Sequence, residues 1–171
     1  LLEQILQSMD LQDAIQLLEA VLYMVCHDGL LRAGELMSGL RVGDFRWSSD
    51  RRSVFITLLR TKTHRQGDPI ELELVASNVS FCAVRLLRMW MDKMQLWGQS
   101  EKQMFPAVVE HNIDGKLTKY FNFGAVYSKT IWIRNLRSLL TQLGHVASAF
   151  SGHSFRAGGA TDLFDAGVAL V

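Results

Sequence analysis

The sequence contains little proline and little cysteine, and it has no long apolar run. Only two of the 171 residues are proline and 49% are hydrophobic, which excludes the polar, proline-rich composition of a disordered chain. No segment approaches the ~18–20 consecutive apolar residues of a membrane-spanning helix, so no membrane partner is expected. The two cysteines, Cys26 and Cys82, are isolated, which predicts two reduced core thiols in an intracellular protein.

Several motifs that carry enzymatic chemistry are also absent. There is no glycine-rich phosphate loop, no nucleophile elbow and no H-E-x-x-H motif, and the five histidines form no metal-binding pattern. We therefore expect no metal and no cofactor. No signal peptide is visible, and neither the start at Leu1 nor the end at Val171 carries a start or stop signal. The 171 residues suit one domain, which we expect to be part of a longer protein.

Charge is strongly segregated along the chain, although the net charge is only +1. Residues 1–31 hold five acidic residues and no Lys or Arg, whereas residues 32–65 hold eight bases and three acids. Residues 115–137 hold five bases and no acid. Segregated basic segments are typical of a protein that binds a polyanion, but they also occur as solvated faces. Charge alone leaves both interpretations open.

The periodicity of apolar residues predicts a mostly helical α+β domain with one small antiparallel β-sheet. Asp10 is the expected N-cap of the first helix and Ser80 that of the third. Residues 98–127 show no clear period and are expected to be irregular, with Asp114-Gly115 as a turn. The predicted helices cover residues 11–27, 31–37, 80–97, 128–143 and 153–166, and the predicted strands cover residues 53–59 and 69–75.

Three cationic features could carry chemistry. His153 and Arg156 stand three residues apart in the first turn of a helix, where backbone N–H groups also attract anions. Arg32 and Glu35 have the same spacing, and Lys62 lies in the polar connection between the two predicted strands. Taken singly, each has an ordinary structural interpretation as a surface ion pair or a solvated side chain.

Taken together and in this order, these features resemble the catalytic domain of tyrosine recombinases, the phage-integrase-like family that breaks and joins DNA. The resemblance rests on HDGLLRAGELMSGLRVGDFRW around Arg32 and on SGHSFRAGGATDLFDAGV around His153 and Arg156. It extends over nearly the whole chain, because SFCAVRLLRMW, MFP and YSKTIWIRNLRSLL match the order of segments in that domain. The motif G-H-S-x-R-x-G-x-A-T is similar to the corresponding motif in recombinases of mobile elements. It implies double-stranded DNA as the partner, self-association on DNA, and site-specific recombination or integration through a 3′-phosphotyrosine.

The resemblance also implies a role for each candidate residue. Arg32 and Arg156 would bind the phosphate oxygens on which charge develops, and His153 would add a hydrogen bond or transfer a proton. Lys62 would protonate the departing 5′-oxygen as a general acid. Glu35 would hold Arg32 in position.

The chain departs from the family in what it lacks. The family's tyrosine nucleophile lies well C-terminal to the H-x-x-R motif, whereas this chain ends 15 residues after Arg156. Tyr23, Tyr120 and Tyr127 all precede the motif and are expected to be structural. We therefore expect residues 1–171 to be a catalytic domain without the N-terminal DNA-clamping domain and without the nucleophile segment, so that it binds phosphate but cannot cleave.

Two other functions stay open from the sequence. One is a domesticated DNA-binding module that has lost strand cleavage, and the other is a helical protein-interaction domain. The intact protein would act in the nucleus if it is eukaryotic, and in the cytoplasm or nucleoid if it is bacterial or viral. Trp90, Trp97 and Trp132 are expected in the core or an interface. Gly158-Gly159 is expected to allow close packing against a neighbouring helix or against DNA backbone, and packing against a helix is favoured.

Overall fold

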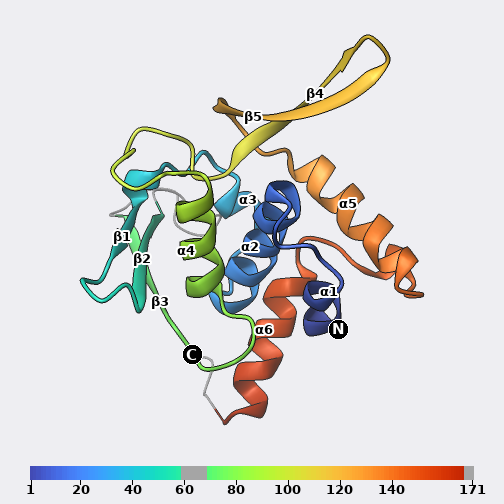
Figure 1. Ribbon diagram of the computed structural model, residues 1–171. Helices are drawn as coiled ribbons and strands as arrows, with labels where there is room; N and C mark the ends of the chain where they lie inside the picture. The colour runs from blue at the N-terminus through green and yellow to red at the C-terminus, as the bar shows by residue number, and fades with distance from the viewer. Residues whose placement is uncertain (59–68, 168–171) are drawn as a thin grey trace.

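The computed structural model describes residues 1–58 and 69–167 (Figure 1). The predicted α+β class is confirmed, but the described strands form two antiparallel sheets, of three and two strands, rather than one. The elements in chain order are α1 (Leu2–Gln7), α2 (Ala14–Asp28), α3 (Ala33–Leu36), β1 (Phe45–Trp47), β2 (Ser53–Leu58), β3 (Ile70–Val75), α4 (Ala83–Lys93), β4 (Pro106–Ile113), β5 (Lys116–Val126), α5 (Lys129–Gln142) and α6 (Ser154–Asp165).

Helix α2 is the centre of the domain, and α4 and α6 pack against it (Figure 1). Every residue from Leu17 to Cys26 is buried, as expected for a helix that is apolar on all sides. Both cysteines are free and buried, which confirms that they belong to the core. Trp90 and Trp132 are fully buried as well, so that the tryptophans in α4 and α5 are core residues rather than exposed platforms.

The helix caps differ from those predicted. Asp13, not Asp10, caps α2 by accepting hydrogen bonds of 2.9 Å from the backbone N–H groups of Ile15 and Gln16. Asp10 instead accepts from the N–H group of Gln12 in the preceding turn. Helix α4 begins at Ala83 rather than near Ser80, because the carboxylate of Asp28 at the end of α2 accepts the Ala83 N–H group at 3.0 Å. A cap supplied by another helix leaves no local signal in the sequence.

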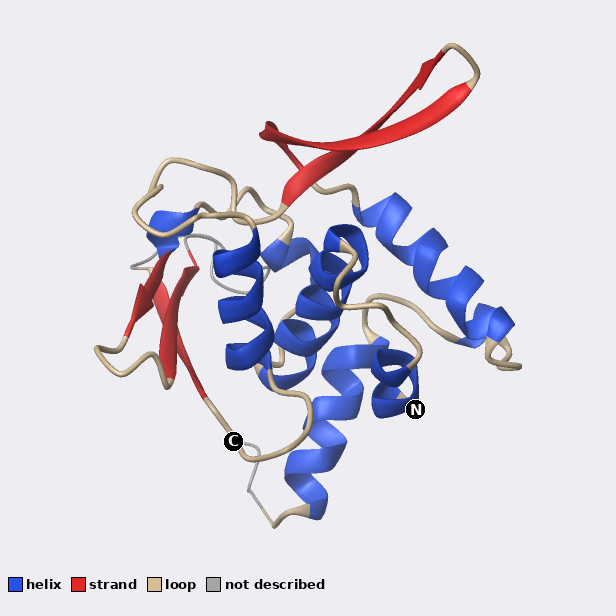
Figure 2. Cartoon of the chain, in the orientation of Figure 1, coloured by secondary structure: helices blue, strands red, loops and turns tan. Residues whose placement is uncertain are grey.

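Strands β2 and β3 form the predicted hairpin, and β1, which was not predicted, adds a third strand to the sheet beside α4 (Figure 2). In β2 every second residue is buried, namely Val54, Ile56 and Leu58, which is the pattern that predicted the strand. The pairing of β2 with β3 runs from Ser53 opposite Val75 to Leu58 opposite Ile70. Lys62 belongs to the connection between these strands and lies outside the described residues.

The expectation that residues 98–127 are irregular was wrong. Strands β4 and β5 form a long hairpin that projects from the helical body (Figure 2). Asp114 and Gly115 both have positive φ, of 52° and 79°, as a two-residue hairpin turn requires. The first half of β5, Lys116 to Tyr120, is exposed on both faces, so this part lacks the alternation that identifies a half-buried strand. The hairpin is held by its backbone ladder and by the cross-strand ion pair of Lys119 with Glu110 at 3.0 Å. At its base, the half-buried Phe121 ring packs edge-on against the buried Trp90 ring, with centroids 5.4 Å apart.

Candidate functional site

Arg32 lies in the tight connection between α2 and α3, where its backbone is extended. The Glu35 carboxylate accepts one hydrogen bond from the Arg32 backbone N–H group at 2.7 Å and another from the guanidinium at 3.2 Å. The Glu35 side chain is only 9% exposed, whereas that of Arg32 is 28% exposed. The buried Glu35 carboxylate therefore holds the Arg32 guanidinium on the side of the protein interior, while part of the Arg32 side chain stays open to solvent. The pairing predicted from the spacing forms, and its role in catalysis stays a prediction.

His153 and Arg156 lie at the start of α6, with His153 directly before the helix and Arg156 in its first turn. Between them, Phe155 is buried and stacks on Tyr23, with ring centroids 4.7 Å apart. Trp132 completes this aromatic cluster at 5.6 Å from the Phe155 ring. The cluster fixes the first turn of α6, so that the exposed His153 and the half-buried Arg156 have a rigid support. Within the described part of the chain, neither side chain has a hydrogen-bond or ion-pair partner.

The segment before α6 packs directly against the start of α3. A Cβ atom placed on Gly152 would lie 3.2 Å from the Cβ atom of Ala33. Gly152 precedes His153, and Ala33 follows Arg32, so this contact brings together two segments that are far apart in the sequence. Arg156 is one turn further along α6. The convergence of all four predicted residues, including Lys62, on a single pocket stays a prediction.

The end of α2 ties α6 to the rest of the domain. His27 has Asp28 Oδ1 at 2.9 Å from its Nδ1 atom and Asp162 Oδ2, on α6, at 3.0 Å from its Nε2 atom. The hydrogen bond with Asp28, followed by the charges of Asp28 and Asp162, raises the pKa of His27 against the effect of burial. The sequence analysis missed these positioning residues, because His27 and Asp162 are separated by 135 positions and form no motif.

This arrangement predicts a pH dependence of folding stability. A protonated His27 ring donates to both carboxylates, whereas a neutral ring points a lone pair at one of them. Because the folded-state pKa is raised, the stabilisation is complete below about 6.5, the ordinary pKa of the ring, and is lost as the pH rises through the raised value. We expect the difference in unfolding free energy between wild type and His27→Gln, measured by urea denaturation, to shrink as the pH rises from 6 to 9. A constant difference would contradict this role of the charged ring.

Two of the three tyrosines are buried, which opposes a role as nucleophile. Tyr23 is completely buried in the aromatic cluster, and Tyr127 is 2% exposed. The Tyr127 hydroxyl donates a 2.6 Å hydrogen bond to Glu19, which also accepts from Asn135 at 2.7 Å. Burial, followed by the Glu19 charge, raises the pKa of Tyr127, which opposes formation of a phenolate. Both side chains are therefore part of the core, and their exclusion as nucleophiles stays a prediction.

Tyr120 is 47% exposed and lies on β5. Its ring packs edge-on against the ring of His111 on the neighbouring strand, with centroids 5.4 Å apart. The hairpin that carries it projects from the side of the domain opposite to α6 (Figure 1). Tyr120 therefore belongs to the projecting hairpin and not to the packed helices around α6.

Solved structures of DNA recombinases share this arrangement of helices and strands. A crystal structure of XerH site-specific recombinase bound to difH substrate, a pre-cleavage complex, matches with a TM-score of 0.62 and 17% sequence identity over 96% of this chain. A post-cleavage complex of XerH with palindromic difH substrate matches with a TM-score of 0.58 and 17% identity, again over 96% of this chain. The fold is tyrosine-recombinase-like. No protein-family model and no curated protein matches the sequence.

The chain spans about two fifths of the solved recombinases that it resembles, covering 41% and 40% of their lengths. Among residues 1–58 and 69–167, no helix is both long and apolar enough to span a bilayer. In the same residues, no group of three or more His, Cys, Asp or Glu side chains could hold a metal ion.

Proposed function

We propose that this chain is the catalytic domain of a tyrosine recombinase, which breaks and rejoins double-stranded DNA through a 3′-phosphotyrosine in the intact protein. The observation that carries the proposal is the close approach of Gly152, which precedes His153, to Ala33, which follows Arg32. This approach supports a position of His153 and Arg156 near the Arg32–Glu35 pair. The recombinase-like fold also supports the proposal.

The chemistry follows from the charge that develops during attack on a phosphodiester. Negative charge grows on the two non-bridging oxygens, and fixed guanidinium donors stabilise it because they need no reorganisation. Arg32, already held by Glu35, and Arg156, supported by Phe155, would bind these oxygens. His153 would add a further donor at the positive end of the α6 dipole. Lys62 would protonate the 5′-oxygen as it leaves.

The attacking tyrosine is proposed to lie outside residues 1–171. The burial of Tyr23 and Tyr127 and the place of Tyr120 on the projecting hairpin support this assignment. Residues 1–171 would then bind DNA without cleaving it, and DNA-bound copies of the intact protein would associate with one another during strand exchange.

The proposal predicts DNA binding that depends strongly on salt. We expect residues 1–171 to bind duplex DNA weakly and without sequence preference, because phosphate contacts carry no sequence information. With on the order of three phosphate contacts, affinity falls about 40-fold between 50 and 200 mM salt. Fluorescence anisotropy with a labelled duplex measures this, and the double variant Arg32→Ala/Arg156→Ala is expected to show a shallower salt slope. An affinity that is independent of salt would contradict phosphate contacts and favour a protein-interaction domain.

A further inference from the structure

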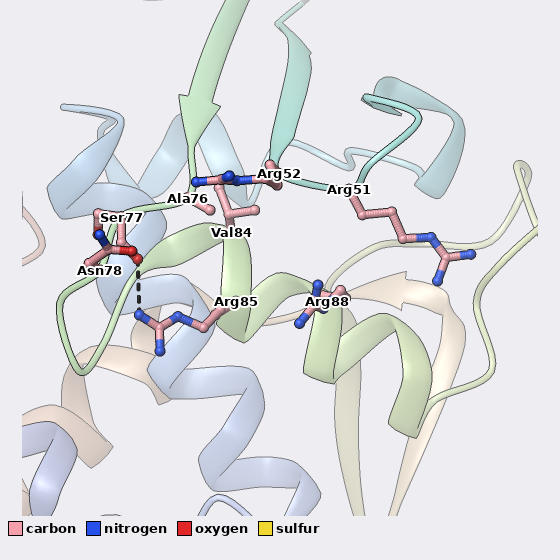
Figure 3. Close-up of a pocket in the computed structure, with 8 residues that line it drawn as sticks. All are labelled: Arg51, Arg52, Ala76, Ser77, Asn78, Val84, Arg85 and Arg88. Carbon is pink, nitrogen blue, oxygen red and sulfur yellow. Dashed lines mark hydrogen bonds between the residues drawn. The ribbon is translucent and has the colours of Figure 1, made fainter.

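A second cationic site lies at one end of the three-stranded sheet, away from the candidate active site. A cavity of about 490 Å³ opens where the turn between β1 and β2, the segment after β3 and the first half of α4 meet (Figure 3). A volume of this size suits a small ligand or part of a larger one. Four arginines line it, together with Ser77 and Asn78. The arginines are Arg51, Arg52, Arg85 and Arg88.

No carboxylate lines this arginine pocket. Within the described residues, none of its four arginines forms an ion pair, whereas Arg41 and Arg46 nearby are paired with Glu101 and Glu71. Asp50, in the adjoining turn, accepts from the Ser48 hydroxyl and from the backbone N–H group of Arg52, and these hydrogen bonds, followed by the Arg52 charge, lower its pKa. Its carboxylate forms no ion pair with the Arg52 guanidinium among the described residues. Four like charges around one cavity repel one another, so that binding of an anion there relieves the repulsion.

The guanidinium groups are arranged by the fold rather than scattered on the surface. Arg85 and Arg88 are three residues apart on α4 and therefore lie on one helix face. The Arg85 guanidinium donates to the backbone carbonyls of Ser77, at 2.9 Å, and Val79, which anchors it at the cavity wall. Figure 3 shows Arg52, Arg85 and Arg88 around the buried Val84. An anchored guanidinium loses less conformational entropy when it binds a ligand.

Arg51 stands at the rim of the pocket. Its guanidinium stacks over the Trp97 ring at 4.2 Å from the centroid and extends away from the other three in Figure 3. The proposed phosphate contacts therefore rest on Arg52, Arg85 and Arg88, whereas Arg51 adds positive charge at the rim.

The pocket is separate from the candidate active site. It lies beside Arg52 and Ala76, at the end of the sheet where Ser53 pairs with Val75. The connection that contains Lys62 leaves from the opposite end, where Leu58 pairs with Ile70. None of Arg32, His153 and Arg156 lines the cavity.

We propose that the arginine pocket is a second phosphate-binding site, which takes a ligand carrying two or more adjacent phosphate groups. Phosphate is favoured over a single carboxylate because several guanidinium forks can each bind a pair of its oxygens, and the charge of adjacent phosphates matches that of the cluster. Adjacent phosphates occur both in a nucleic-acid backbone and in a small polyphosphate. The site is inferred from its own side chains and does not depend on the proposed recombinase function.

The test uses residues 1–171 and tripolyphosphate, followed by isothermal titration calorimetry at low salt. We expect one site per chain and a loss of affinity of at least tenfold in Arg52→Ala/Arg88→Ala. The matched control Arg41→Ala/Arg46→Ala removes the same charge from arginines that are already paired, and it is expected to change the affinity less than twofold. Arg156→Ala, in the candidate active site, is also expected to leave tripolyphosphate binding unchanged, which separates this proposal from the previous one.

The outcomes divide clearly. An equal loss of tripolyphosphate affinity in the two double variants would overturn the proposal, because general charge alone would then explain binding. An unchanged affinity in Arg52→Ala/Arg88→Ala would also overturn it, because the anion would then bind at another site. Partial recovery of the affinity in Arg52→Lys/Arg88→Lys supports the proposal, since lysine restores the charge without the paired N–H donors of the guanidinium. Displacement of tripolyphosphate by duplex DNA identifies a nucleic-acid backbone as the ligand, and retention identifies a small polyphosphate. Circular dichroism melting checks that the exposed substitutions leave the fold intact.

Discussion

In the full-length protein, Arg156→Ala is expected to lower the covalent protein–DNA adduct by about 100- to 1000-fold, the usual loss when one donor to a developing charge is removed. Affinity for DNA is expected to fall only a few-fold, because Arg156 is one phosphate contact among several. The two effects separate because transition-state stabilisation and ground-state binding depend on different interactions. Nicked suicide substrates trap the adduct for measurement by denaturing electrophoresis, and anisotropy gives the affinity.

Two controls make this experiment decisive. Arg137→Ala removes an exposed arginine on α5 whose Nε atom donates to the Phe150 carbonyl at 3.4 Å, and it is expected to leave adduct formation within a few-fold of wild type. Residues 1–171 alone are expected to form no adduct. An adduct from this shorter chain mapped to Tyr120 would contradict the assignment of the nucleophile. DNA binding without any adduct in the full-length wild type would instead favour a domesticated, non-cleaving module.

Gly159→Ala is expected to destabilise the fold by about 1–3 kcal/mol, because an added methyl group must be forced into closely packed backbone. A Cβ atom at Gly159 would lie 2.1 Å from the carbonyl oxygen of His27, at the point where α6 crosses the end of α2. Backbone cannot move aside as a flexible side chain can, so α6 must shift. Urea denaturation measures the loss of stability, and the covalent adduct of the full-length protein is expected to fall with it.

Gly158→Ala is the matched control for this prediction. A Cβ atom there would lie 3.6 Å from a ring carbon of His27, which is an ordinary van der Waals contact. Alanine is favoured over glycine within a helix by about 1 kcal/mol, so that Gly158→Ala is expected to be neutral or stabilising. Equal effects of the two substitutions would show that helix propensity, rather than the contact with α2, determines the role of this glycine pair.

The sequence predicted the elements whose signals are local. The apolar residues of α2, the alternation of Val54, Ile56 and Leu58 in β2 and the Ser128 cap of α5 each lie within a few positions of the structure that they specify. The Arg32–Glu35 pair was predictable for the same reason, because three residues separate neighbours on one turn. The close packing expected of the Gly158-Gly159 pair is confirmed at Gly159.

The sequence by itself thus determined the fold class, the central helix and the order of the cationic motifs along the chain. The tertiary structure decided which distant groups meet: the contact of Gly152 with Ala33, the bond between His27 and Asp162, and the gathering of four arginines around one cavity. It also decided the β4–β5 hairpin, whose exposed strands carry no hydrophobic period. The physical reason is the sequence separation of the interacting residues. Periodicity and capping act over a few positions, whereas these contacts join distant positions and depend on how whole helices and strands pack.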